Sequence, residues 1–145
     1  MSETTDAVVA ASVTEGPIDA ESLERAVLGR ADGALVTFRG VVRDHDGGRG
    51  VTALEYEAHP DAADFVHAAC VRIAERFSAD AVTVAAVHRV GALAVGDVAL
   101  VATAASAHRA VAFAACQELV DDIKATVPIW KRQRFTDGES EWVGL

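Results

Sequence analysis

The chain has 145 residues, the length of one ordinary domain, and 51% of them are apolar, which is enough to build a buried core. Its formal net charge of −9 argues against binding to nucleic acid or to an anionic membrane surface, since both require extended basic surfaces. Because the sequence has no apolar run of membrane-spanning length and no secretory signal pattern, we expect a soluble protein of the cytoplasm.

The N-terminal part is predicted to contain two strands and one helix. We expect residues 1–7 to be disordered and an apolar strand to follow at 8–13. A helix is predicted over 19–28, because the aspartate at its start can accept a hydrogen bond from the free N–H groups of the first turn. The apolar and β-branched run 34–42 predicts a second strand, in which Gly40 is a candidate bulge.

The middle of the chain predicts a hairpin, a helix and a buried strand. Residues 51–58 alternate like a strand that returns across the polar, glycine-rich loop 43–50 to pair with the strand before it. An apolar stripe predicts a helix over 61–77, and the apolar run 81–90 predicts the buried strand. Residues 91–97 have turn residues at both ends and are expected to form a connection.

The C-terminal part predicts another buried strand at 98–105 and a long helix at 107–126, with Ser106 as its N-cap. Pro128 is expected to end this helix, because the residue before a proline is pushed out of helical geometry. A short last strand is predicted at 141–143. About three helices and six or more strands in mixed order indicate an α+β fold, and we expect residues 8–145 to form a single domain.

Two cations, His108 and Arg109, open the long C-terminal helix, where acidic residues would be stabilising. The first turn of a helix offers free N–H groups, and an anion bound there would also attract an imidazole and a guanidinium. The pair therefore predicts an anion site. The alternative is that Arg109 is solvent-exposed and His108 packs on a neighbouring strand.

The chain has thirteen cationic residues, and two of them, Lys124 and Lys131, are lysines. Unlike arginine, lysine can lose its proton and act as a base or nucleophile. The break at Pro128 allows both side chains to approach one pocket, where the two ammonium groups, together with Arg109, would lower the pKa of one lysine. The alternatives are a lysine that stabilises a helix C-terminus at 124 and a basic surface turn at 131.

Arg43 follows a predicted strand directly, so it can be held firmly beside a ligand; the alternative is a solvated loop tip. We expect no metal, since His45 and its neighbouring aspartates lack the spacing of a ligand set. The pair His88 and Arg89 is interpreted as structural. Further candidates for the site are Arg39, His45, Arg132 and Arg134.

Six segments, in this order and spacing, resemble the large catalytic subunit of molybdopterin synthase (MoaE-type). The resemblance covers about three-quarters of the chain, and SAHR followed by PIWK is its most specific part. The segments are FRGVVRDH at 38–45, HRVGALAVGD at 88–97, SAHRAVAF at 106–113, DDIK at 121–124, PIWK at 128–131 and DGESEWV at 137–143.

The resemblance implies a sulfur transferase of molybdenum cofactor biosynthesis that needs no bound cofactor. Members of the family convert cyclic pyranopterin monophosphate into molybdopterin, using sulfur from the C-terminal Gly-Gly thiocarboxylate of a small ubiquitin-like carrier subunit. The family assembles as a homodimer of large subunits with a carrier at each end, a heterotetramer. Its fold is an α/β hammerhead with an added antiparallel β subdomain.

The resemblance also implies roles for single residues. Lys124 and Lys131 match the essential lysines of the family, and Arg43, His108 and Arg109 match its anion-pocket residues. We therefore expect these three residues to hold the phosphate and pterin of the substrate, and the lysines to position the thiocarboxylate. An alternative of another class is a pterin- or anion-binding module, or an interaction subunit, without catalysis.

Overall fold

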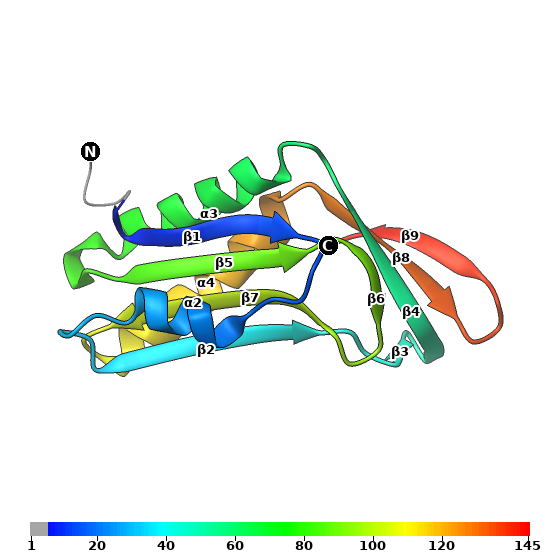
Figure 1. The fold of residues 1–145 in the computed structure, drawn as a ribbon, viewed down its shortest axis with the longest axis horizontal. Coiled ribbons are helices and arrows are strands. Elements are labelled where there is room, and N and C mark those ends of the chain that lie inside the picture. Colours follow the sequence, from blue (N-terminus) through cyan, green and yellow to red (C-terminus); the bar gives the residue numbers. More distant parts are fainter. Residues whose placement is uncertain (1–5) are drawn as a thin grey trace.

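The computed structural model describes residues 6–145, which contain three α-helices and nine strands (Figure 1). Most of the segment 1–7, for which disorder was expected, lies outside the described residues. The strands are β1 (Val8–Thr14), β2 (Ala34–Val41), β3 (His45–Asp46), β4 (Arg49–Ala58), β5 (Thr83–Arg89), β6 (Gly91–Ala94), β7 (Val98–Ser106), β8 (Ile129–Phe135) and β9 (Ser140–Gly144). The helices are α2 (Ala20–Val27), α3 (Ala62–Arg76) and α4 (Arg109–Thr126).

The first sheet has the strand order β1-β5-β7-β2, in which β1 is parallel to β5 and the other pairs are antiparallel. Helices α3 and α4 cover one face and α2 lies on the other (Figure 1). Along β5, Val84 and Ala86 pack under α3 and α4, whereas Ala85 packs toward α2. Because both faces are covered, β5 and β7 are almost continuously apolar.

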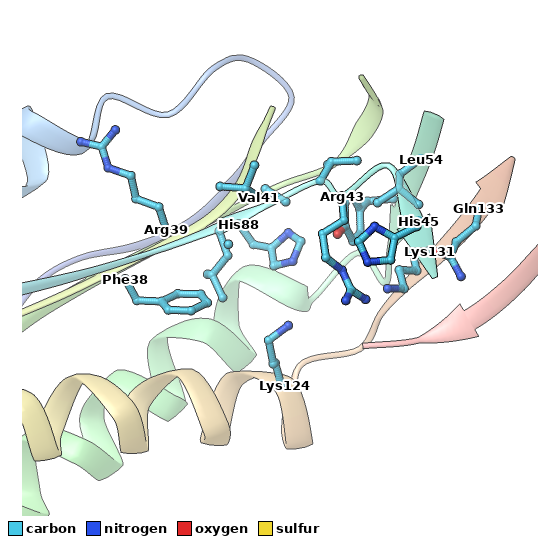
Figure 2. Close-up of a pocket in the computed structure, with 15 residues that line it drawn as sticks. Phe38, Arg39, Val41, Arg43, His45, Leu54, His88, Lys124, Lys131 and Gln133 are labelled. Carbon is cyan, nitrogen blue, oxygen red and sulfur yellow. The ribbon is translucent and has the colours of Figure 1, made fainter. Parts of the chain in front are cut away.

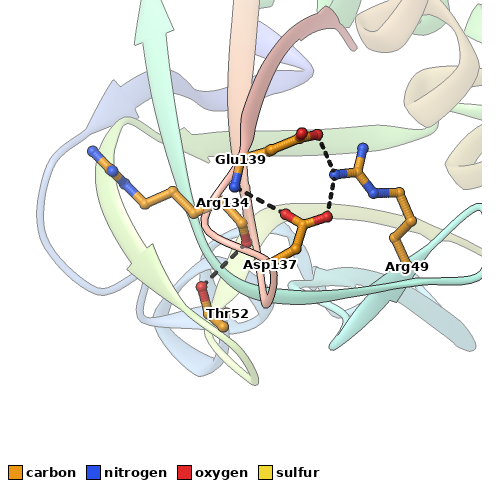
Figure 3. A network of polar contacts seen from close by, with 5 residues as sticks. All are labelled: Arg49, Thr52, Arg134, Asp137 and Glu139. Carbon is orange, nitrogen blue, oxygen red and sulfur yellow. Dashed lines mark hydrogen bonds and ion pairs between the residues drawn. The ribbon is translucent and has the colours of Figure 1, made fainter.

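The second sheet is antiparallel, with the order β3-β4-β8-β9 and with β6 also paired to β4. Arg49 holds its outer turn: the guanidinium donates hydrogen bonds to Asp137 at 2.9 Å and to Glu139 at 3.0 Å (Figure 3). The same guanidinium stacks 3.6 Å from the centre of the Phe135 ring. These contacts hold the turn between β8 and β9 against the first residue of β4.

Several sequence predictions are confirmed. The Asp19 side chain accepts a hydrogen bond of 3.1 Å from the N–H of Ser22, and the β2–β7 register shifts directly after Gly40. Helix α4 ends at Thr126 before Val127, which is extended as expected before Pro128. None of the helices in residues 6–145 combines the length and the apolar character needed to cross a membrane.

Two predictions about pairing and helix start are wrong. The strand β2 does not form a hairpin with β4; it pairs with β7, while β4 pairs with β8 in the other sheet. Ser106 does not cap α4, because it is the buried last residue of β7; the N-cap is His108, and the helix begins at Arg109, three residues after Ser106. The strand β6 was expected to be a connection, and no strand was predicted where β8 lies.

Candidate active site

A cavity of about 340 Å³ lies where the two sheets meet (Figure 2). Its wall combines the ends of β2, β5 and β7 from the first sheet, β3, β4 and β8 from the second, and the last turn of α4. The path of the chain explains this position: β5 leads directly into β6 of the second sheet, and β7 then returns to the first. The cavity is thus built from segments throughout the chain.

Lys124 and Lys131 both line this cavity, as the sequence predicted. Lys124 belongs to the last turn of α4, and the reversal at Pro128 starts β8 alongside β4. On β8 the alternation of side chains turns Lys131 inward on the same side as buried Gln133, while Trp130 remains exposed. The two lysines therefore enter one cavity from a helix and from a strand (Figure 2).

The two ammonium groups influence each other. Partial burial lowers the pKa of the Lys124 amine, and the positive charge of Lys131 lowers this pKa further. A lysine with a lowered pKa holds a larger fraction of neutral amine near neutral pH. A neutral amine can accept a proton or act as a nucleophile, and this environment favours the neutral form of Lys124.

Arg43, on the segment that leads into β3, and His45, the first residue of β3, also line the cavity. Arg43 lies 3.5 Å from the carboxylate of Asp46, which also accepts a hydrogen bond of 2.7 Å from the amide of Gln133. This amide, followed by the charges of Lys131, Arg43 and His45, holds the pKa of Asp46 below its usual range. The glycine-rich loop is thereby tied to β8, and Arg43 is kept beside the lysines.

His108 and Arg109, which were expected to hold the phosphate and pterin of the substrate, do not line the cavity of the same chain. They lie at the start of α4, and the fifteen helical steps between Arg109 and Lys124 correspond to about 22 Å. Both residues are exposed and form no ion pair with another residue of 6–145. The sequence thus identified two groups of cations, and the structure places His108 and Arg109 at the start of α4 and Lys124 at its end.

The other candidates take different positions. Arg39 is among the residues that line the cavity, but Figure 2 shows its side chain pointing away from Lys124. Arg132 lies on the other side of β8, 3.5 Å from Glu55 and with its guanidinium 5.3 Å from the ring of Trp142. Arg134 is exposed outside the cavity, and its carbonyl accepts a hydrogen bond of 3.2 Å from Thr52 (Figure 3).

Sequence reasoning missed two residues of the cavity wall, His88 and Tyr56. Their rings meet edge to face, with centroids 4.9 Å apart and an interplanar angle of 75°. The only available signal for His88 was a histidine at the end of an apolar run, which is also typical of a structural position. No group of three or more His, Cys, Asp or Glu side chains within residues 6–145 is arranged to hold a metal.

The fold and the cavity define an α+β protein with a cavity lined by cationic side chains at the junction of two sheets. Comparisons with known proteins agree. The family model described as "MoaE protein" matches residues 13–126. The chain is 40% identical over 134 residues to molybdopterin synthase catalytic subunit 1 of Mycobacterium tuberculosis, an alignment that covers 91% of this chain and 88% of that one.

Solved structures give the same result. The molybdopterin synthase structure from Staphylococcus aureus matches with a TM-score of 0.86 and 30% identity, over 100% of this chain and 99% of that one. A complex of subunits 1 and 2 of molybdopterin-converting factor from Helicobacter pylori shares the fold, with a TM-score of 0.69 and 17% identity over 95% and 89% of the two chains. The chain belongs to the MoaE family, and its curated relatives are catalytic subunits of molybdopterin synthase.

Proposed function

We propose that this protein is the catalytic subunit of a molybdopterin synthase. It converts cyclic pyranopterin monophosphate to molybdopterin with sulfur from the C-terminal thiocarboxylate of a small ubiquitin-like carrier. The observation that carries this proposal is the convergence of Lys124, Lys131 and Arg43 on one cavity in a chain whose net charge is −9. Such a cavity attracts anions, and both the phosphate of the substrate and the thiocarboxylate are anionic.

Arg43 is suited to bind the phosphate, because a guanidinium can donate two hydrogen bonds to one anion. Lys131 then holds the thiocarboxylate by charge. Lys124, whose pKa is lowered, exchanges protons as the sulfur attacks the substrate and as water cleaves the acyl carbon–sulfur bond of the resulting thioester, which leaves the sulfur on the substrate and releases the carrier as a carboxylate. The carrier reaches the cavity with an extended Gly-Gly tail, which is narrow enough to enter between side chains. The H. pylori complex of two subunits supports a partner of this kind.

His108 and Arg109 belong to the proposed site only if a second copy of the chain supplies them. A two-fold axis that sets two α4 helices antiparallel brings the start of one helix to the lysine end of the other. Strand β2 is an edge of the first sheet, and beside it lies an apolar groove formed by Val36, Phe38, Phe113, Cys116 and Val120. The Phe113 residue is 62% exposed, and a homodimer formed through this groove would bury it. We propose this homodimer as the core of the heterotetramer.

We also propose a cytoplasmic location. Both cysteines, Cys70 and Cys116, are buried free thiols, which suits a reducing compartment. Burial raises the pKa of Cys70 to about 12, so this thiol does not compete with the carrier for sulfur chemistry near neutral pH.

Reconstitution tests the proposed function. The protein is mixed with cyclic pyranopterin monophosphate and a thiocarboxylated carrier, and molybdopterin is measured after oxidation to its fluorescent form. We expect product with the thiocarboxylated carrier and none with the same carrier ending in an ordinary carboxylate or lacking its Gly-Gly end. Binding of the pterin without product formation would instead support the non-catalytic binding module.

A further inference from the structure

The imidazole of His88 occupies an unusual position in the wall of the cavity. It lies near the end of β5, paired with Val13 on β1 and Leu100 on β7, and the residue is only 2% exposed. Among the buried polar residues of 6–145, it is the only one with an ionisable side chain. Its ring nevertheless borders the cavity and faces Lys124 (Figure 2).

Two contacts fix the ring and its tautomer. The Nδ1 atom lies 2.6 Å from the backbone carbonyl oxygen of Arg89, and since a carbonyl can only accept, Nδ1 carries the proton. The ring of Tyr56 packs against it edge to face. In the neutral ring Nε2 is then an acceptor, and it has no protein hydrogen-bond partner among residues 6–145.

The charge state follows from the surroundings. Burial lowers the pKa of His88 to about 4, and the nearby ammonium of Lys124 acts in the same direction, against the bond to the Arg89 carbonyl. At neutral pH the ring is therefore uncharged. The cavity is also lined by the cationic groups of Lys124, Lys131 and Arg43, and to these the ring adds the lone pair of Nε2 rather than another positive charge.

We propose that His88 is the positioning residue of Lys124: when substrate and carrier occupy the cavity, the unpartnered Nε2 accepts a hydrogen bond from the Lys124 amine and holds that amine toward the reacting atoms. This inference rests on the proposed function, since it assigns a role within the same site. A lysine side chain has four rotatable bonds, and an acceptor at the cavity wall selects one orientation. Because the acceptor is uncharged, it orients the ammonium while raising the pKa of the Lys124 amine less than a carboxylate would.

Two substitutions separate this role from a structural one. The amide of His88→Asn can replace the Nδ1 donor to the Arg89 carbonyl but leaves nothing at Nε2. The amide oxygen of His88→Gln can replace the Nε2 acceptor but not the Nδ1 bond. If His88 only supports β5, the Asn variant should retain more activity than the Gln variant.

The inference predicts the opposite order in the reconstituted reaction. We expect kcat to fall roughly 10- to 100-fold in His88→Asn, to recover in large part in His88→Gln, and KM for the carrier to stay unchanged in both. Wild-type rates in His88→Asn, or a better Asn than Gln variant, would overturn the inference. A wild-type protein that forms no molybdopterin would instead reject the proposed function.

A second measurement does not depend on activity. With two lysines in the chain, labelling lysine at Cε gives two NMR signals, and Lys131→Arg assigns them. Losing the acceptor removes a bond to the charged amine, so the pKa of Lys124 should fall further in His88→Asn and return in His88→Gln. A Lys124 pKa that is the same in all three proteins would overturn the inference, even if the Asn variant were inactive.

Discussion

Lys124 shows how the position of a lysine in the fold changes its chemical properties. At the end of an exposed helix a lysine is unremarkable, and its sequence context alone favours that interpretation. In the folded protein the helix ends at a cavity that β8 supplies with a second lysine. Both lysines could be predicted as a pair because the chain has only two. Their shared cavity follows from the reversal at Pro128, which the sequence also indicated.

The first prediction at this scale concerns the charge coupling of the lysines. Substituting Lys131 by Ala removes the like charge, so the pKa of Lys124 should rise toward its ordinary value but remain below it, because partial burial persists. The Cε signal of Lys124 titrated by NMR measures this. An unchanged Lys124 pKa in the variant would show that the two amines are too far apart to interact.

The second prediction concerns stability against pH. The folded pKa of His88, about 4, lies below the ordinary value of 6.5, so between these values the unfolded chain binds more protons than the folded one. The contribution of His88 is therefore present above pH 6.5 and is lost as pH falls through 4, by up to about 3 kcal/mol.

Urea unfolding at pH 7 and pH 4.5 tests this loss. His88→Gln should lose less stability on acidification than the wild type, because glutamine does not titrate. Tyr56, Lys124, Lys131, Arg43 and His45 are other titratable or charged side chains that line the cavity, and their contributions cancel in the comparison because both proteins retain them. Equal losses in both proteins would contradict the assignment of a neutral, buried imidazole.

At the scale of elements, the strands were easier to predict than their partners. Alternation in 51–58 correctly indicated β4, but a strand pattern does not specify which neighbour it pairs with. The loop before β4 carries the chain from one sheet to the other, so β2 and β4 never meet as a hairpin. Strand β8 was missed because its alternating face is cationic, which resembles a surface turn.

The backbone just before His108 packs closely against Gly33, and this contact can be tested by a substitution. Gly33 donates its N–H to the Ser106 carbonyl, and a Cβ at Gly33 would lie 2.6 Å from the carbonyl oxygen of Ala107. Gly33→Ala must displace this backbone and should cost about 1–3 kcal/mol in the free energy of unfolding. Gly16→Ala is the control, since nothing lies within 4 Å of its Cβ position. Equal stability of the two variants would contradict the close approach.

At the scale of the whole molecule, the pair His108 and Arg109 lies far from the cavity that holds the two lysines. The sequence identified both, but a linear pattern contains no information about a second copy, and the length of α4 separates them within one chain. The homodimer proposed above predicts a site shared between chains. The long helix, the exposed Phe113 and the free edge of β2 are all on the surface that this dimer would bury.

Complementation tests the shared site. Arg109→Ala and Lys131→Ala chains, each with its own tag, are co-expressed and the mixed dimers are purified through both tags. If Arg109 and Lys131 of different copies form one site, one of the two sites is intact, so the mixed dimer should have about half of the wild-type activity. Each homodimer should be nearly inactive. A mixed dimer as inactive as its parents would show that the site lies within one chain.

The central claim is that the cavity holding Lys124 and Lys131 forms molybdopterin. The most direct test is the single-turnover rate of product formation from the thiocarboxylated carrier for the wild type, Lys131→Ala and Lys124→Ala. Arg25→Ala is the control, because it removes one positive charge from the exposed face of α2. We predict a loss of about 100-fold or more in each lysine variant and an unchanged rate in the control. Wild-type rates in both lysine variants would contradict the account.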